Sequence, residues 1–137
     1  MKGAIFIDSN VFLYAIDGSV PKMQAKAKAA LAEVGPSFTT SIQVLQEVFV
    51  NAVGKLRKPP PDAREFVQSI GQGKVVRPDQ KMVLQAIDTS ERNRISFWDA
   101  MIIEAAVSGK CSILLTEDLN HGQVVRGVRI TNPFLDS

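Results

Sequence analysis

Four acidic residues stand where a parallel sheet could bring their carboxylates to one edge. Asp8 and Asp118 follow short apolar segments that predict strands, whereas Glu47 and Asp99 lie in segments that predict helices. Carboxylates that cluster without basic partners repel one another, and the usual remedy in proteins is a hard divalent cation. Mg²⁺ or Mn²⁺ acting on a phosphate group is the common use of such a site, so these four residues are candidate metal ligands and catalytic residues.

Each of the four acids also has a purely structural interpretation. Asp8 could cap the helix after its strand, and Asp99 could complete a capping box that begins at Ser96. Glu47 could be an exposed helix residue, and Asp118 could make a turn. The chain has 14 acidic residues, so some coincidence is expected. The hypothesis of a metal site therefore depends on the four positions taken together.

Composition narrows the class of protein. The chain has 137 residues, 45% hydrophobic and 22% charged, which predicts one globular domain over residues 1–137. A net charge of +2 means that any binding of nucleic acid must rely on local basic patches. The single cysteine, Cys111, excludes an intrachain disulfide, and the single histidine, His121, argues against zinc sites and histidine-based triads. We find no signal peptide and no membrane-spanning run, which favours a cytoplasmic protein.

Strand-like and helix-like segments alternate along much of the chain. Strands are predicted over residues 4–8, 37–40, 74–77, 112–116 and 128–130, and helices over residues 10–16, 21–34, 41–56, 62–70, 79–92 and 96–109. This alternation predicts an α/β fold with a mainly parallel sheet and helices on both faces, in which ligands bind at the carboxyl ends of strands. The apolar stripes of two helices are expected to face the core and include Phe49 and Trp98, with Glu47 opposite the first stripe.

These residues carry a resemblance to a known family. The segments are I-F-I-D-S-N at residues 5–10, Ser41 with Glu47, F-W-D-A at 97–100, L-L-T-E-D-L at 114–119 and N-P-F at 132–134. In their order and spacing the chain resembles PIN-domain ribonucleases, and most of all the VapC-type toxins of bacterial toxin–antitoxin pairs. The resemblance implies a three-layer α/β/α sandwich and Mg²⁺- or Mn²⁺-dependent cleavage of RNA. It also implies a homodimer and a small antitoxin protein that fills the acidic groove.

The resemblance assigns roles to individual residues. Asp8, Glu47, Asp99 and Asp118 match the four acids of the family, in that order. Asn10 matches a polar residue that steadies the first acid, Thr116 matches a hydroxyl residue beside the metal, and Ser9 stands where threonine is also frequent. Glu117 leaves open which of two neighbouring acids completes the site, and Asp118 is preferred because it fits a T-x-D pattern. The reaction implied is metal-assisted hydrolysis of phosphodiester bonds.

Basic residues near these motifs are candidates for contacts with the RNA backbone. They are Arg94, Lys55, Arg57 and Lys58. Two alternatives to a toxin stay open at this point. One is a PIN nuclease of RNA processing or decay, and the other is a catalytically silent module that binds nucleic acid. Retention of all four acids argues against the silent module.

Overall fold

A six-stranded sheet forms the centre of the protein. The structure is a computed structural model and describes residues 3–136, so Met1, Lys2 and Ser137, which belong to the predicted domain and N-terminus, lie outside the described residues. The strands are β1 (Ile5–Ile7), β2 (Thr39–Ser41), β3 (Lys74–Val76), β4 (Ile113–Leu115), β5 (Val124–Val125) and β6 (Val128–Thr131). Their order in the sheet is β3-β2-β1-β4-β6-β5, and only the pairing of β5 with β6 is antiparallel.

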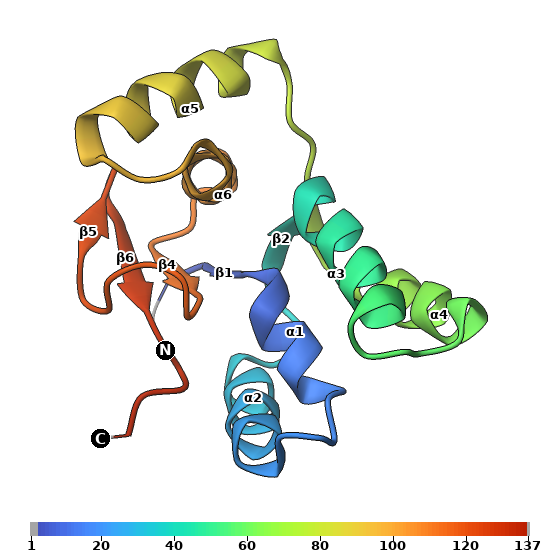
Figure 1. Cartoon of the computed structure of the whole chain (residues 1–137). Coiled ribbons are helices and arrows are strands. Elements are labelled where there is room, and N and C mark those ends of the chain that lie inside the picture. The colour runs from blue at the N-terminus through green and yellow to red at the C-terminus, as the bar shows by residue number, and fades with distance from the viewer. Residues whose placement is uncertain (1–2, 137) are drawn as a thin grey trace.

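Helices cover the sheet on opposite sides (Figure 1). They are α1 (Ser9–Ala15), α2 (Pro21–Val34), α3 (Ile42–Gly54), α4 (Pro60–Ile70), α5 (Gln80–Asn93) and α6 (Phe97–Ser108). Helix α6 contacts β2, β4 and β6 on one side and α5 on the other, so α5 forms the outer layer there. On the opposite side α1 packs against α2 and α3, and α3 packs against α4. The α/β fold with a mainly parallel sheet between helices is therefore confirmed.

The two central strands are apolar throughout and are buried between the helix layers. In β1, Phe6 and Ile7 are completely buried, and in β4 Leu114 and Leu115 are at most 1% exposed. Strands that are covered on both faces have no solvent side, which explains why these segments contain runs of apolar residues rather than an alternation. The chain moves from β1 to one side of the sheet and returns to the other side at β4, so the strand order reverses between these two strands. Such a reversal leaves a crevice at the carboxyl ends, where ligands bind in open α/β sheets.

Side-chain caps fix where the helices near this crevice begin. Asp8 caps α1 by accepting from the Ser9 N–H, and Ser41 caps α3 by accepting from the Val44 N–H. Ser96 caps α6 through the Asp99 N–H at 3.0 Å. Each cap pairs a backbone donor that the first helical turn leaves without an internal partner. The starts of α1, α3 and α6 are thereby held at the carboxyl edge of the sheet.

Several details of the predicted elements are wrong. The second strand begins at Thr39 rather than at residue 37 and extends to Ser41. Helix α3 ends at Gly54 rather than at residue 56, and α4 begins at Pro60 rather than at residue 62. Strand β5 was not predicted, because it has two residues and forms only through antiparallel pairing with β6 at the sheet edge. No helix within residues 3–136 is both long enough and apolar enough to cross a membrane.

The expectation that Trp98 and Phe49 face the core is also wrong. Trp98 is 64% exposed, and Phe49 is 39% exposed. Trp98 is the second residue of α6 and lies in its first turn, at the carboxyl edge of the sheet. The apolar stripe of α6 therefore extends beyond the part of the helix that packs on the core. Helical spacing identifies the face of a helix but not the point along it where the neighbouring layer ends.

A buried carboxylate joins the outer helix layer to the β5–β6 hairpin. Glu104 of α6 is 2% exposed and accepts a hydrogen bond from the Thr89 hydroxyl of α5 at 2.8 Å. Arg126, in the turn of the hairpin, donates to the same carboxylate from Nε and Nη2, each at 3.0 Å. This bidentate pair neutralises the buried charge and connects three elements at one point.

Candidate metal and nucleic-acid site

The fold brings the four predicted acids to the carboxyl edge of the sheet. Asp8 comes directly after β1, and Asp118 lies three residues after β4. Glu47 lies in the second turn of α3, which follows β2, and Asp99 lies in the first turn of α6. Burial is the main cause that raises the pKa of Asp8 and of Asp118, and the negative charges add to it: those of Glu47 and Asp118 at Asp8, and that of Asp99 at Asp118.

Asp8 is the most deeply placed of the four. It is 4% exposed, its Oδ1 accepts from the Ser9 N–H at 2.7 Å, and its Oδ2 accepts from the Thr116 hydroxyl at 2.8 Å. Burial raises the pKa of Asp8 from 3.8 to about 7, against the lowering effect of these two hydrogen bonds. The helix cap is therefore present, and it is compatible with the site hypothesis, because one oxygen caps α1 and the other belongs to the network that joins the acids.

Asn10 and Thr116 form that network. The Asn10 amide donates from Nδ2 to the Thr116 hydroxyl and to Asp118 Oδ2, both at 3.2 Å. Its Oδ1 accepts from the Glu117 N–H at 3.3 Å. Thr116 is 1% exposed, and its hydroxyl also accepts from the Asp118 N–H at 3.1 Å. Together these bonds fix Asp8 and Asp118 relative to each other beyond the carboxyl ends of the paired strands β1 and β4.

Glu47 reaches the same edge from α3. Ser9 donates its hydroxyl proton to Glu47 Oε1 at 3.1 Å, and Gln43 Nε2 lies 3.4 Å from Oε2. Partial burial raises the pKa of Glu47, and the carboxylates of Asp118 and Asp99 raise it further. The prediction that Glu47 points away from the stripe of α3 agrees with this position, since the carboxylate is half-buried over the start of α1.

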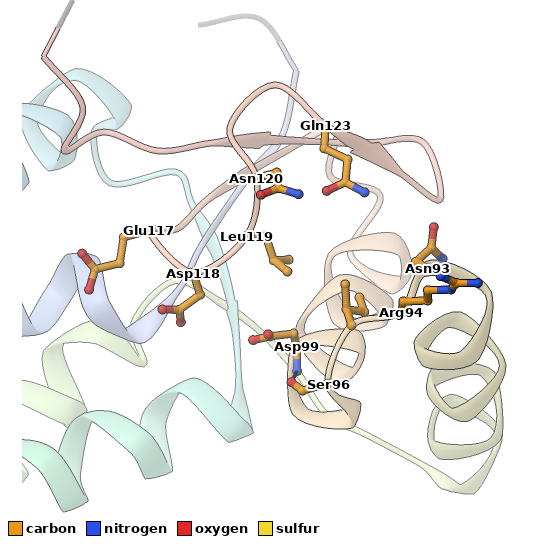
Figure 2. Close-up of a pocket in the computed structure, with 10 residues that line it drawn as sticks. Asn93, Arg94, Ser96, Asp99, Glu117, Asp118, Leu119, Asn120 and Gln123 are labelled. Carbon is orange, nitrogen blue, oxygen red and sulfur yellow. Dashed lines mark hydrogen bonds between the residues drawn. The ribbon is translucent and has the colours of Figure 1, made fainter.

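Asp99 completes the cluster from the opposite wall of the crevice. Only its backbone N–H takes part in the cap by Ser96, so its carboxylate is available to the site. Figure 2 shows the Asp99 carboxylate pointing toward the side of the crevice that carries Asp118. The capping-box interpretation of Asp99 is therefore compatible with a functional role of its side chain.

The side chains of Glu117 and Asp118 point to different sides of the loop that follows β4. In Figure 2 the Glu117 carboxylate points away from Asp99, whereas the Asp118 side chain lies between Glu117 and Asp99. Burial raises the pKa of Glu117 and the charge of Asp118 raises it further, while the Tyr14 hydroxyl lowers it. The geometry therefore groups Asp118, rather than Glu117, with the other three acids.

Two cavities open on either side of Asp118. One, of about 530 Å³, lies between the end of α5, the start of α6 and the loop after β4, and Asp99 and Asp118 form part of its wall. The other, of about 490 Å³, lies between α1 and α3 and includes Tyr14 and Lys55. Glu117 and Asp118 border both cavities, so the acid cluster stands between them.

The donor set suits a hard cation. All four acids offer oxygen, and none of the ion pairs found among residues 3–136 involves any of them. Carboxylates that raise one another's pKa without a basic partner are the environment in which Mg²⁺ or Mn²⁺ lowers the electrostatic cost. Within the described chain no three His, Cys, Asp or Glu side chains stand close enough to hold an ion as they are placed. Ion binding would therefore require some of these carboxylates to turn toward a common point.

The four predicted basic residues are distributed unevenly around the site. Lys55 lines the cavity between α1 and α3, and Arg94 lines the cavity beside Asp99. Figure 2 shows the Arg94 side chain running along the wall, away from the two carboxylates. Arg57 and Lys58 line neither cavity. The pKa of Asp17 is lowered mainly by its hydrogen bonds from Ser19, and the charge of Lys58 adds a smaller lowering effect.

Several residues of this region escaped sequence reasoning. They are the amides Gln43, Asn93, Asn120 and Gln123, the phenol of Tyr14, and the pair Glu104–Arg126. Amides in loops and at helix ends have no spacing rule that connects them. The only signal available was the polar stretch after the T-E-D segment, which stands next to a candidate acid.

The amino-acid sequence matches the model of one known protein family. The family described as PIN domain matches residues 5–126. The chain belongs to the PIN-domain family. PIN domains are typically nucleases that use divalent metal ions, which agrees with the oxygen-only acid cluster. Comparison with curated protein sequences finds no significant match.

Solved structures of similar fold support the assignment as a PIN domain. A toxin–antitoxin complex from Klebsiella pneumoniae matches with a TM-score of 0.73 and 20% identity over 95% of this chain and 97% of that chain. VapC20 from Mycobacterium tuberculosis, a toxin that cleaves the sarcin–ricin loop, has a TM-score of 0.64 and 20% identity over 81% and 87% of the two chains. DNA-bound VapBC from Salmonella typhimurium has a TM-score of 0.64 and 18% identity over 95% and 98%. At these identities the likeness shows the fold.

Proposed function

We propose that this PIN-domain protein is a metal-dependent ribonuclease and acts as the toxin of a toxin–antitoxin pair. The observation that carries the proposal is the cluster of Asp8, Glu47, Asp99 and Asp118 at the carboxyl edge of the sheet, without a basic partner in any of the ion pairs of residues 3–136. The fold of VapC-type toxins supports the toxin assignment. RNA in the cytoplasm is the substrate that the proposal implies.

The same four carboxylates are the residues that would hold Mg²⁺ or Mn²⁺. When bound, such an ion supplies Lewis acidity and makes a coordinated water molecule more acidic. The contribution of the protein's own residues is to hold the carboxylates in position. Asn10 and Thr116 fix Asp8 relative to Asp118, and Ser9 orients Glu47. These hydrogen bonds hold the side chains at one edge of the sheet and so limit the rearrangement that ion binding would require, which is the usual contribution of the residues behind a metal site.

Basic groups next to the acids would position the phosphate backbone of RNA. Lys55 lies in the cavity between α1 and α3, and Arg94 lies in the cavity next to Asp99. We assign Arg57 and Lys58 a weaker, longer-range contribution, because they line neither cavity. Phosphate contacts of this kind are independent of sequence and weaken as salt concentration rises.

Exposed apolar side chains support the proposal of protein partners. One group lies on α5 and consists of Val83, Leu84 and Ile87, and a second consists of Phe49 and Val50 on α3. Apolar groups that remain exposed in an isolated chain are typical of interaction surfaces. A homodimer and a cognate antitoxin are the two partners that we propose, by analogy with the toxin–antitoxin complexes of similar fold.

The decisive experiment is an RNA cleavage assay with purified, antitoxin-free protein. Total RNA and transfer RNA are incubated with Mn²⁺ or Mg²⁺, with EDTA, and with the Asp8→Asn and Asp99→Asn variants. We expect cleavage that EDTA and either variant abolishes, while circular dichroism shows that both variants are folded. Asp88→Asn, which removes an exposed acid of α5, is the matched control and should cleave like the wild type.

Other outcomes of this assay distinguish the alternatives. Near-wild-type cleavage by both site variants would refute the assignment of these acids. Absence of cleavage from folded protein that does not bind Mn²⁺ in calorimetry would support the silent binding module. A folded, Mn²⁺-binding protein that cleaves no RNA in the pool would contradict a broad ribonuclease and favour a single narrow target.

A further inference from the structure

The cavity next to Asp99 has a chemical character that differs from that of the acid cluster. Three neutral amide side chains border it, from Asn93 at the end of α5 and from Asn120 and Gln123 in the loop after β4. Figure 2 shows the amides of Asn120 and Gln123 above the cavity and Asn93 at its side, with Asp99 and Asp118 at the opposite wall. We call the part bordered by these three amides the amide pocket.

The amides of the pocket are available to a ligand. Among the hydrogen bonds found for residues 3–136, none involves the side chain of Asn120 or of Gln123. Asn93 uses its Nδ2 to donate to the Thr89 carbonyl at 3.0 Å, which leaves Oδ1 as an acceptor. The pocket therefore presents both donors and acceptors, and it presents them without charge.

The walls of the pocket are held in place before any ligand arrives. Thr89 of α5 and Arg126 of the β5–β6 turn both bind the buried Glu104 carboxylate of α6. Two of these elements, α5 and α6, carry walls of the pocket, and the third, the β5–β6 hairpin, begins directly after Gln123 of the remaining wall. Arg94 adds a left-handed residue, with φ of 53°, that reverses the chain between α5 and α6. A cavity fixed in this way binds a ligand without first ordering its own walls.

The chemistry of the pocket fits a nucleobase better than a phosphate. Amide side chains pair with the polar edges of bases through one donor and one acceptor. A phosphate would face the carboxylates of Asp99 and Asp118 rather than the amides, and Arg94, the one basic side chain among the lining residues, is the group that would contact the neighbouring backbone phosphate. Leu119 and Ile95 also line the cavity and offer apolar surface to the face of a base.

We propose that the amide pocket binds the nucleobase next to the scissile phosphate and sets the sequence preference of cleavage. This inference rests on the proposed ribonuclease function, because Asp99 and Asp118 connect the pocket to the acid cluster. The acids would act on the backbone of the strand, and the amides would select one base beside the cut.

The test compares the cleavage positions of the wild type with those of two pocket variants, Asn120→Ala and Gln123→Ala. Fragment ends from a pool of single-stranded RNA are sequenced with Mn²⁺ present. We expect the wild type to prefer one base at one position beside the cut by at least about tenfold, which is about 1.4 kcal/mol. Each variant should lower that ratio to below about threefold. Gln72→Ala, an exposed glutamine in the turn after α4, should keep the wild-type preference.

A binding measurement separates failure of this inference from failure of the ribonuclease proposal. The Asp8→Asn protein in EDTA is titrated with fluorescent octamers of adenylate, cytidylate, uridylate and alternating guanylate–uridylate. We expect affinities that differ by at least about tenfold among octamers, and a loss of that difference when Gln123→Ala is added. This holds whether or not the wild type cleaves RNA.

Three results would overturn the inference. The first is cleavage by the wild type with no base preference beside the cut. The second is a preference that persists in both pocket variants, with thermal melts showing that they are folded. The third is equal affinity of the Asp8→Asn protein for all octamers, or a difference that Gln123→Ala does not change.

Discussion

Replacing Asp8 by asparagine should change the stability of the metal-free protein in opposite directions at low and high pH. Asp8 is 4% exposed, and its pKa is about 7 in the folded protein against 3.8 for an ordinary aspartate. As the pH rises through this interval, the unfolded chain loses the proton that the folded protein still holds. Ionisation therefore favours unfolding, and stability falls with rising pH between about 4 and 7.

The size of the effect follows from the two pKa values. The difference between 3.8 and about 7, at about 1.36 kcal/mol for each pH unit, corresponds to about 4 kcal/mol of stability lost above pH 7. The amide of Asp8→Asn carries no charge and avoids this loss. It does lose one hydrogen bond, because both carboxylate oxygens of Asp8 accept, from the Ser9 N–H and from the Thr116 hydroxyl. One unmade buried bond costs about 1–2 kcal/mol.

The avoided burial of charge and the lost hydrogen bond change the free energy of unfolding in opposite directions. The lost hydrogen bond is the larger effect at low pH, and the avoided charge is the larger effect at high pH. At pH 4 the variant should be less stable than the wild type by about 1 kcal/mol, and at pH 8 it should be more stable by about 2–3 kcal/mol. The assay is urea unfolding followed by far-ultraviolet circular dichroism, in EDTA, at pH values from 4 to 8. The control is Asp88→Asn on the exposed side of α5, for which we expect changes within about 0.5 kcal/mol.

A difference between variant and wild type that stays constant from pH 4 to pH 8 would refute this reasoning. It would mean that Asp8 does not retain its proton in the folded protein. Glu47, Asp118 and Glu117 also have raised pKa values, but they are present in both proteins and largely cancel in the comparison. The comparison therefore isolates the cost of burying the Asp8 charge.

Four further outcomes are expected. Mn²⁺ at a hundredfold its dissociation constant should stabilise the wild type by about 2.7 kcal/mol at pH 8 and stabilise Asp99→Asn less, as thermal melts would show; an equal gain in both would contradict the role of Asp99. Thr116→Val should cost about 2 kcal/mol in urea unfolding, because it leaves the Asp118 N–H without its acceptor and Asp8 without a donor, and a change below about 0.5 kcal/mol would count against the network. Trp98→Ala should cost less than about 1 kcal/mol, since the side chain is 64% exposed, whereas a loss of 3 kcal/mol or more would place it in the core. Arg126→Ala should cost about 3 kcal/mol by leaving the buried Glu104 unpaired, with Arg126→Lys intermediate, and equal stability of all three proteins would disprove that pairing.

The parts of the fold that the sequence predicts are those governed by local rules. The apolar run of β1, the proline at the start of α2 and the serine caps of α3 and α6 each mark an element boundary through neighbouring residues alone. Trp98 shows where this reasoning ends. Its spacing places it on the inner face of α6, but only the position of the sheet edge decides that this turn extends beyond the core.

The residues of the site also fall into two groups, those that local sequence rules predict and those that they do not. Asp8 and Asp118 could be proposed from sequence because each follows an apolar strand, and parallel strands end at a common edge. The amides of Asn93, Asn120 and Gln123 could not, because they come from one helix end and one loop that meet only in the folded chain. Contacts between distant segments, such as the Arg126 pair with Glu104, leave no periodic pattern in the sequence.

The two most buried carboxylates among residues 3–136 differ in how their negative charge is balanced. Glu104 is 2% exposed and paired with Arg126 through two hydrogen bonds, so its charge is balanced within the protein. Asp8 is 4% exposed, and both of its hydrogen bonds come from neutral donors. An arginine beside Asp8 would remove the electrostatic cost of its burial, but it would also occupy the position that a cation needs. A buried acid that is held by neutral donors and left without a counterion keeps its proton at low pH, and its ionised form is stabilised when a cation binds, which makes Asp8 the first residue to test.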